Sequence, residues 1–358
     1  MATIAPELKA PPVNQTRVIR ARILGLMPAM VILAGALVVG TLASPYFLDL
    51  SSMLVNTGRY VEVGLLALAL TIVIINGDID LSVASNLAVC AATLGLLTEA
   101  GIPLPLAGLA AVIVGIALGA LNGFFVTVLN LPSLVVTLAT LALYRGVAQV
   151  MLGDRAITSY PSTFLSVDQV RLFSDSAGIP VPLMMLFAFA LLFWFLLQKT
   201  DFGLECFLTG SNANATRFSG ISTGRTRMTA FCLSGMMAGT AAVLITSRLG
   251  STRSNIGLGL ELLAITVVVL GGTDIFGGRG SIGGTVLALF AVMAVREAMA
   301  IKNVNGQTQD AVVGVILILA ILIPSVIRRV QERRRRKRRS AATKNLGSTV
   351  GELSTRVR

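Results

Sequence analysis

Residues 71–86, TIVIINGDIDLSVASN, decide the fold of this chain. The stretch begins as an apolar run and then places Asn76, Gly77, Asp78 and Asp80 where lipid is expected. Ten Leu, Ile and Val residues in 60–75 favour membrane insertion by roughly 3–6 kcal/mol, whereas two aspartates in mid-membrane cost about 5–7 kcal/mol. Asp78 and Asp80 therefore cannot face lipid at depth: we expect them at the cytoplasmic boundary, along a cavity, or in a break buried by protein.

The composition places the chain among membrane proteins. It has 358 residues, of which 54% are hydrophobic and 13% charged, and its mean hydropathy is +0.83, too apolar for a soluble domain. The chain has no histidine, which excludes His-based zinc sites and Ser-His triads. It contains no Gly-x-x-x-x-Gly-Lys-Ser/Thr pattern, so it does not bind ATP through a P-loop. We interpret Cys90, Cys206 and Cys232 as packing residues.

Apolar runs of about 20 residues, cut at polar or Pro/Gly breaks, predict an all-α polytopic helical bundle with about ten membrane spans. The expected spans are 23–46, 59–76, 80–98, 103–129, 133–152, 179–198, 228–247, 257–273, 281–301 and 308–327. Gly115, Gly119 and Gly123 recur at four-residue spacing, as do Gly235 and Gly239. Such small faces let helices approach closely in lipid.

The distribution of cations predicts the orientation. The tail 1–22, the loop 199–227 and the tail from Arg328 onward carry 4, 4 and 12 of the 29 Lys and Arg residues. With ten spans all three lie on one side, so both termini are expected in the cytoplasm. This divides the chain into a cytoplasmic tail (1–22), a membrane domain (23–327) and a basic cytoplasmic tail (328–358), with loop 153–178 outside and loop 199–227 inside.

A second break resembles the first. In AITVVVLGGTDIFGGRGSIGGT (264–285), seven of the fourteen residues 271–284 are glycine. Broken helices are therefore expected near 76–82 and 271–284, where irregular backbone is buried in protein or lines a wet path. Locally, Asp78-Ile79 aligns with Asp274-Ile275, although both breaks point the same way and no inverted repeat is inferred.

Several functions are compatible with such breaks on residue chemistry alone. Asp78 and Asp274 could form the dyad of an intramembrane aspartyl protease, although the rest of such a signature is missing. An ion-coupled secondary transporter could use the carboxylates and half-helix ends as ion ligands. The breaks could also be tight turns without any role in transport.

Four ordered segments carry a resemblance to a family. NGDIDLSVASNLAV (76–89) resembles the signature of permease subunits from bacterial ABC importers for ribose, xylose, arabinose and related sugars. LNGFFVTVLNLPSLVVTLATLALYRGVA (121–148), TGSNANATRFSGI (209–221) and VLGGTDIFGGRGSIGGT (269–285) resemble the later segments of that family. Segments 178–200 and 250–257 are most similar to the branch that imports rhamnose or autoinducer-2. Asp78 and Ala84 stand where that family usually has glycine, and Ser133 where it has Phe.

The resemblance implies a non-enzymatic permease in the bacterial inner membrane that imports rhamnose or autoinducer-2, or a ribose-type sugar. Its implied partners are two cytoplasmic ABC ATPase subunits, a second permease or a second copy of this chain, and an external solute-binding protein. The ion-coupled transporter remains the alternative. The coupling segment that would contact the ATPase includes Gly210, Asn212, Ala215, Arg217, Phe218, Ser219 and Gly220, with Asn212 near a helix start and Gly220 as its stop.

A neutral sugar needs hydrogen-bonding groups along its path. The expected path residues are Asn76, Asp78, Asp80, Asn86, Asn122, Thr137, Gln149, Thr273, Asp274 and Gln309. The ionisable residues in or near spans are expected to pair within the bundle; they are Glu62, Arg145, Glu261, Arg296, Glu297 and Asp310. RRVQERRRRKRRS could bind nucleic acid or anionic lipid. We interpret it as a topology-fixing tail beside membrane lipid, and we predict no nucleic-acid partner, cofactor, metal or catalytic residue.

Overall fold

The computed structural model describes residues 15–49, 54, 56–165, 170–172, 178–322 and 326. Residues 1–14 and 328–358, which carry most of the two expected tails, lie outside this part, as do 166–169 and 173–177 of the expected external loop. The chain divides into two units, Met1–Val304 and Asn305–Arg358.

The described part is almost entirely helical, as expected, with one two-stranded antiparallel pair in which Arg171 faces Pro180. The elements of the first unit are α1 (Gln15–Ala43), α3 (Val61–Ile75), α4 (Val83–Glu99), α5 (Leu104–Thr127), α6 (Ser133–Leu152), α7 (Ser162–Leu165), β1 (Arg171–Leu172), β2 (Ile179–Pro180), α8 (Val181–Lys199), α9 (Asp201–Ser211), α10 (Ala213–Phe218), α11 (Thr223–Leu249), α12 (Leu260–Leu270) and α13 (Ile282–Ile301). The second unit contains the helix Gly306–Leu322.

Ten apolar helices of the described part match the ten expected spans, and six of them are long and apolar enough to cross a membrane. The expected lengths of three others are too long, because α3, α4 and α12 have only 15, 17 and 11 residues. The tenth, Gly306–Leu322, ends where residues outside the described part begin. At about 1.5 Å per residue, the 11 residues of α12 extend only about 16 Å, against a hydrocarbon core of about 30 Å. The Gly- and Asp-bearing breaks shorten α3, α4 and α12.

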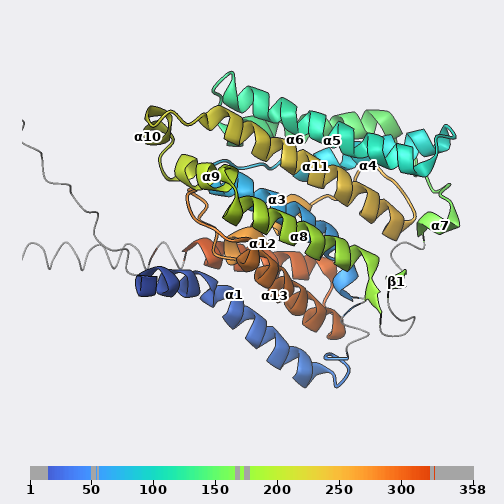
Figure 1. Cartoon of the computed structure of the whole chain (residues 1–358). Coiled ribbons are helices and arrows are strands. Elements are labelled where there is room, and N and C mark those ends of the chain that lie inside the picture. The colour runs from blue at the N-terminus through green and yellow to red at the C-terminus, as the bar shows by residue number, and fades with distance from the viewer. Residues whose placement is uncertain are drawn as a thin grey trace, which may run out of the picture. The chain divides into compact units, whose positions relative to one another are not determined.

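Helix α3 lies at the centre of the first unit. Every one of its 15 residues is buried, and it packs against α8, α9, α11, α12 and α13. Figure 1 shows α3 between α11 on one side and α12 on the other. Because five neighbouring helices cover α3 on all its faces, the first break at its end is surrounded by protein and not by lipid.

The expected glycine faces pack against each other, which confirms that prediction. Gly115 and Gly119 of α5 meet Gly235 and Gly239 of α11 so closely that a methyl group on Gly235 would stand 2.0 Å from the Gly115 carbonyl oxygen. The two backbones approach through these glycines because no side chain separates them. The opposite face of α5 exposes large apolar residues such as Leu109 and Ile113, as a lipid-facing surface does.

Candidate functional site

The first break begins with a glycine-terminated helix end. Gly77 adopts a left-handed conformation with φ of +86°, and its N–H donates to the Ile74 carbonyl oxygen while the Asp78 N–H donates to that of Val73. This double hydrogen bond is the Schellman motif, in which glycine avoids the strain that a Cβ would cause. The Ile75 carbonyl oxygen accepts from the Gly278 N–H at 2.8 Å, so the second break completes the hydrogen bonding of the first.

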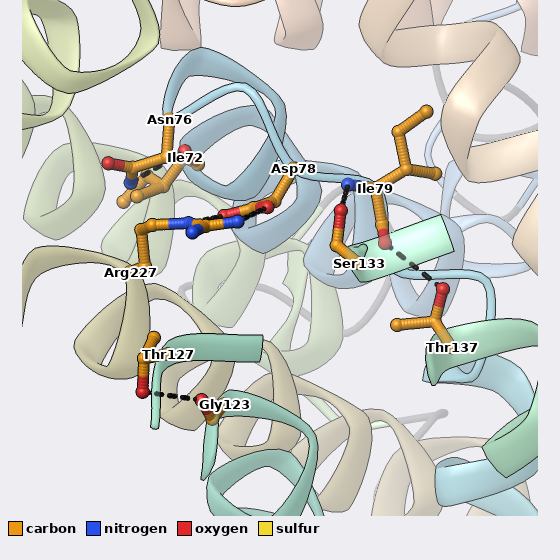
Figure 2. Close-up of polar contacts among 9 residues, drawn as sticks. All are labelled: Ile72, Asn76, Asp78, Ile79, Gly123, Thr127, Ser133, Thr137 and Arg227. Atoms are coloured by element: carbon orange, nitrogen blue, oxygen red, sulfur yellow. Dashed lines mark hydrogen bonds and ion pairs between the residues drawn. The ribbon is translucent and has the colours of Figure 1, made fainter. Parts of the chain in front are cut away.

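Asp78 forms a two-pronged ion pair with Arg227 of α11 (Figure 2). The Arg227 Nε donates to Asp78 Oδ2 at 2.6 Å, and Arg227 Nη2 donates to Asp78 Oδ1. The Asp78 side chain is 2% exposed and that of Arg227 is 27% exposed. Both carboxylate oxygens are therefore neutralised inside the protein, and the pair ties the break to the first turns of α11.

Side chains from the start of α6 satisfy the irregular backbone that follows (Figure 2). The Ile79 N–H donates to Ser133 Oγ at 3.3 Å, and Thr137 Oγ1 donates to the Ile79 carbonyl oxygen at 3.1 Å. Non-helical backbone at membrane depth is stable only where its polar groups find partners in protein. Ser133, where the family has Phe, thus supplies one of these partners.

Asp80 organises a buried polar network at the start of α4. Its Oδ1 accepts from the Ser82 N–H and from Ser82 Oγ at 3.0 and 2.7 Å, and its Oδ2 accepts from Ser234 Oγ of α11 at 2.7 Å. Ser82 Oγ accepts from Asn122 Nδ2 at 2.7 Å, and Asn122 Oδ1 accepts from the Tyr144 hydroxyl at 3.2 Å. The network joins α4, α5, α6 and α11 through groups that lipid could not satisfy.

The second break repeats the helix end of the first. Gly272 has φ of +84°, and the N–H groups of Gly272 and Thr273 donate to the carbonyl oxygens of Val269 and Val268. Aligned through these helix ends, Gly77 matches Gly272, so Asp78 matches Thr273. The expected alignment of Asp78 with Asp274 is therefore displaced by one residue, because Asp78 directly follows Gly77 whereas Thr273 separates Asp274 from Gly272.

A tight turn follows the second helix end. The Asp274 N–H donates to the Arg279 carbonyl oxygen at 2.9 Å, and the Gly277 N–H donates to the Asp274 carbonyl oxygen at 2.9 Å. The Phe276 N–H donates to Asp274 Oδ1 at 3.3 Å. Asp274 therefore shapes the turn 274–279, at whose tip Phe276 is 77% exposed.

The two breaks and the end of α9 meet backbone to backbone. A methyl group on Gly210 would stand 1.8 Å from the Ile75 carbonyl oxygen and 2.5 Å from the Gly278 nitrogen, and one on Gly277 would stand 2.8 Å from the Gly77 Cα. We call this four-residue contact, Gly77, Gly210, Gly277 and Gly278, the glycine junction. Its residues lie on three segments far apart in the sequence, each in one of the blocks that carry the family resemblance.

The expected coupling segment forms a short exposed helix, α10. The Asn212 side chain caps it by accepting from the Ala215 N–H at 3.0 Å, and Gly220 ends the segment with φ of +83°, as expected. Thr216 is the one buried residue among 211–220, and Phe218 is 92% exposed. Ala215, Arg217 and Ser219 are exposed as well. Figure 1 shows α10 beside α9 at one end of the unit.

The structure gathers most, but not all, of the expected path residues. Asn76, Asp78, Asp80, Asn86, Asn122, Thr137 and Thr273 are buried around the two breaks or on the α4 and α5 faces that adjoin them. Gln149 is exposed near the far end of α6, and Gln309 belongs to the second unit. The structure therefore does not bring Gln149 to the others.

Three buried polar atoms around the glycine junction have no hydrogen-bond partner among the described residues: Asn76 Oδ1, Thr209 Oγ1 and Thr273 Oγ1. Asn76 and Thr209 directly precede Gly77 and Gly210 in the sequence. Thr273 follows α12, and a methyl group on Gly280 would stand 2.8 Å from both Thr273 Oγ1 and Ile75 Cγ1. Buried polar groups are nearly always paired, so each unpaired one calls for an explanation. Asn76 and Thr273 were expected as path residues, whereas Thr209 was not.

The sequence reasoning missed three partners that hold the first break: Arg227, Ser234 and Tyr144. In the sequence, Arg227 is one of several cations of loop 199–227, and Tyr144 and Ser234 are single polar residues within apolar runs. A usable signal was available for Arg227, since it stands at the start of an apolar helix whose insertion it opposes.

An ion pair and several hydrogen bonds within the bundle hold three of the ionisable residues that were expected to pair there. Arg248 Nε donates to Glu62 Oε1 at 2.9 Å, and Asn56 Nδ2 donates to Glu297 Oε1 at 2.7 Å. The Arg145 guanidinium donates to the carbonyl oxygens of Ser254 and Ile256, each at 2.9 Å. These contacts fix helix ends to one another.

The geometry does not support the protease hypothesis. An aspartyl dyad needs two carboxylates that share a proton, but Asp78 uses both oxygens on Arg227 and Asp274 Oδ1 accepts from the backbone of its own turn. Among the described residues, no three His, Cys, Asp or Glu side chains gather into a group able to hold a metal ion.

Comparisons with known proteins identify the family. Residues 53–321 match the family model of the branched-chain amino acid transport system / permease component. The chain is 35% identical over 285 residues to the autoinducer 2 import system permease protein LsrD of Escherichia coli strain K12 and of Shigella flexneri, covering 78% of this chain and 85% of each relative.

The same protein of Salmonella paratyphi B is 35% identical over 287 residues. No solved structure matches. These similarities confirm the resemblance to sugar-importer permeases and to their autoinducer-2 branch, and they favour an importer permease over an ion-coupled secondary transporter. The chain belongs to the family of the branched-chain amino acid transport system / permease component, and it is a multi-pass membrane protein.

Proposed function

We propose that this chain is the membrane permease of a binding-protein-dependent ABC importer for a sugar or sugar-like solute, with autoinducer-2 or rhamnose favoured over a ribose-type sugar. The observation that carries the proposal is the 35% identity to the autoinducer-2 permeases over 85% of their length. That similarity extends along nearly the whole relative, not over a single motif. The absence of a P-loop from the sequence supports a separate source of ATP hydrolysis.

The proposed assembly contains two cytoplasmic ABC ATPase subunits, a second permease or a second copy of this chain, and an external solute-binding protein. It lies in the bacterial inner membrane with both termini in the cytoplasm, loop 153–178 outside and loop 199–227 inside. The exposed helix α10 supports the assignment of loop 199–227 to the cytoplasm, because Phe218 and Arg217 are exposed and can enter a groove on an ATPase.

The solute path is proposed to run past the glycine junction. Asn76, Thr209 and Thr273 each offer a buried polar atom that no described residue uses, and a hydroxyl-rich solute supplies hydrogen bonds to such groups when the junction opens. Asp78 and Asp80 act differently: their carboxylates hold the break in shape through Arg227, Ser82 and Ser234. Weak binding along the path is sufficient if the binding protein supplies the affinity.

Reconstituted transport tests this function. We would incorporate the chain into proteoliposomes alone, and with its co-expressed ATPase and binding protein, and measure uptake of labelled autoinducer-2, rhamnose and ribose. Uptake is expected only in the full assembly and only with ATP. A matched assembly whose ATPase lacks its P-loop lysine is the control and is expected to be inactive. Uptake by the chain alone, driven by an ion gradient, would contradict the proposal that it is the permease of an ABC importer.

A further inference from the structure

The second break presents an exposed aromatic side chain, Phe276. Phe276 is 77% exposed at the tip of turn 274–279, where the two residues that follow it, Gly277 and Gly278, have no side chain to cover it. Three hydrogen bonds within the turn, all involving Asp274, hold this tip. A large apolar side chain presented on an ordered turn loses little conformational entropy when a partner covers it.

The turn is continuous with the coupling segment. A methyl group on Gly278 would stand 2.5 Å from Ser211 Oγ, and Ser211 directly precedes Asn212, the residue that caps α10. The start of α10 and the turn therefore touch, although more than sixty residues separate them in the sequence. Phe218 and Phe276 project from two adjoining segments on the same end of the helical unit.

The charge around these two aromatic residues is mainly positive, because the one carboxylate of the turn, Asp274, accepts a hydrogen bond from the Phe276 N–H at 3.3 Å. Arg217, Arg225 and Arg279 are exposed on α10, at the start of α11 and at the end of the turn, and acidic side chains are missing from 206–260. An interface core of aromatic side chains with a cationic rim fits a partner whose groove has an acidic rim.

We propose that α10 and turn 274–279 form one composite docking surface for the ATPase subunit, with Phe218 and Phe276 as its two apolar anchors. The inference rests on the proposed function and extends the ATPase contact from the coupling segment to the second break. A partner seated on both segments holds Gly210 and Gly278 together and acts directly on the ends of α3 and α12, since the Gly278 N–H donates to the Ile75 carbonyl oxygen.

The test measures how much co-expressed ABC ATPase is retained by the tagged full-length chain in detergent. Phe276→Asp is expected to reduce the retained ATPase at least fivefold, as is Phe218→Asp, because a charge in an apolar anchor position is desolvated without a partner. Leu258→Asp is the matched control. Leu258 is 70% exposed but follows α11 at the end opposite to α10, so its variant is expected to retain the ATPase fully.

The outcomes separate the inference from the function on which it rests. Retention by Phe276→Asp with loss by Phe218→Asp would overturn the composite surface and leave the coupling segment in place, with Phe276 then facing the lipid surface. Retention by both variants would overturn the coupling segment too, and loss by Phe276→Asp alone would overturn the shared surface. Thermal unfolding of each variant, with Phe276→Ala as a milder change, checks that the chain still folds.

Discussion

At the scale of single residues, the pairing of Asp78 with Arg227 explains how a carboxylate that is 2% exposed remains charged inside the bundle. An isolated charge there is costly, but the two-pronged contact provides charge compensation and two hydrogen bonds. Removing one partner leaves the other uncompensated, and the cost of that for a buried pair is about 3–5 kcal/mol. Arg227 is partly exposed, so the lower end of this range applies.

Asp78→Ala is therefore expected to lower the free energy of unfolding by about 3 kcal/mol, whereas Asp78→Ala combined with Arg227→Met is expected to recover most of the loss. Thermal unfolding in detergent measures both. The control pair is Glu99 with Arg155, 3.2 Å apart with side chains 45% and 53% exposed, where Glu99→Ala is expected to cost about 0–1 kcal/mol. If the double variant is the least stable, the pair does not compensate Asp78.

At the scale of elements, α9 fixes the position of both breaks through the glycine junction. The contact allows no side chain at Gly210, because a methyl group there would stand 1.8 Å from a backbone oxygen. Backbone cannot rotate away as a flexible side chain can, so any added atom separates α9 from α3. The junction thereby transmits a displacement of α9 to the helix ends around the proposed path.

Gly210→Ala is expected to abolish ATP-driven uptake and to lower the unfolding temperature by several degrees. Gly283→Ala is the matched control, since a methyl group there meets nothing within 4 Å and alanine favours a helix over glycine by about 1 kcal/mol. Uptake in proteoliposomes and thermal unfolding distinguish the two variants. Equal behaviour would show that the close contact at Gly210 is not needed.

At the scale of the whole molecule, the proposed topology makes a prediction about labelling. Asp154 and Asn214 are both exposed, in the loops proposed to lie outside and inside. A membrane-impermeant maleimide is expected to label Asp154→Cys in intact cells and Asn214→Cys only in inverted vesicles. Burial raises the pKa of the Cys206 thiol to about 12, so this native cysteine stays protonated and contributes little background; the unmodified chain measures the remainder. Labelling of Asn214→Cys from outside would contradict the topology.

The sequence alone determined the ten apolar helices, the two breaks, the glycine faces of α5 and α11 and the short helix α10. These follow from local rules: hydrophobic run length, four-residue glycine spacing, and an Asn cap followed by a terminating Gly. The lengths of α3, α4 and α12 were overestimated, because a hydrophobic run does not show where the backbone stops hydrogen bonding to itself.

The tertiary structure alone decided what the breaks contact. Nothing local to Asp78 points to Arg227, which lies 149 residues away, and nothing local to Gly77 points to Gly210 or Gly277. The choice of partner depends on which buried charges and bare backbone segments the packing of α3 brings together. The hydropathy of the sequence shows that Asp78 cannot face lipid, whereas the packing of the helices determines that it contacts Arg227.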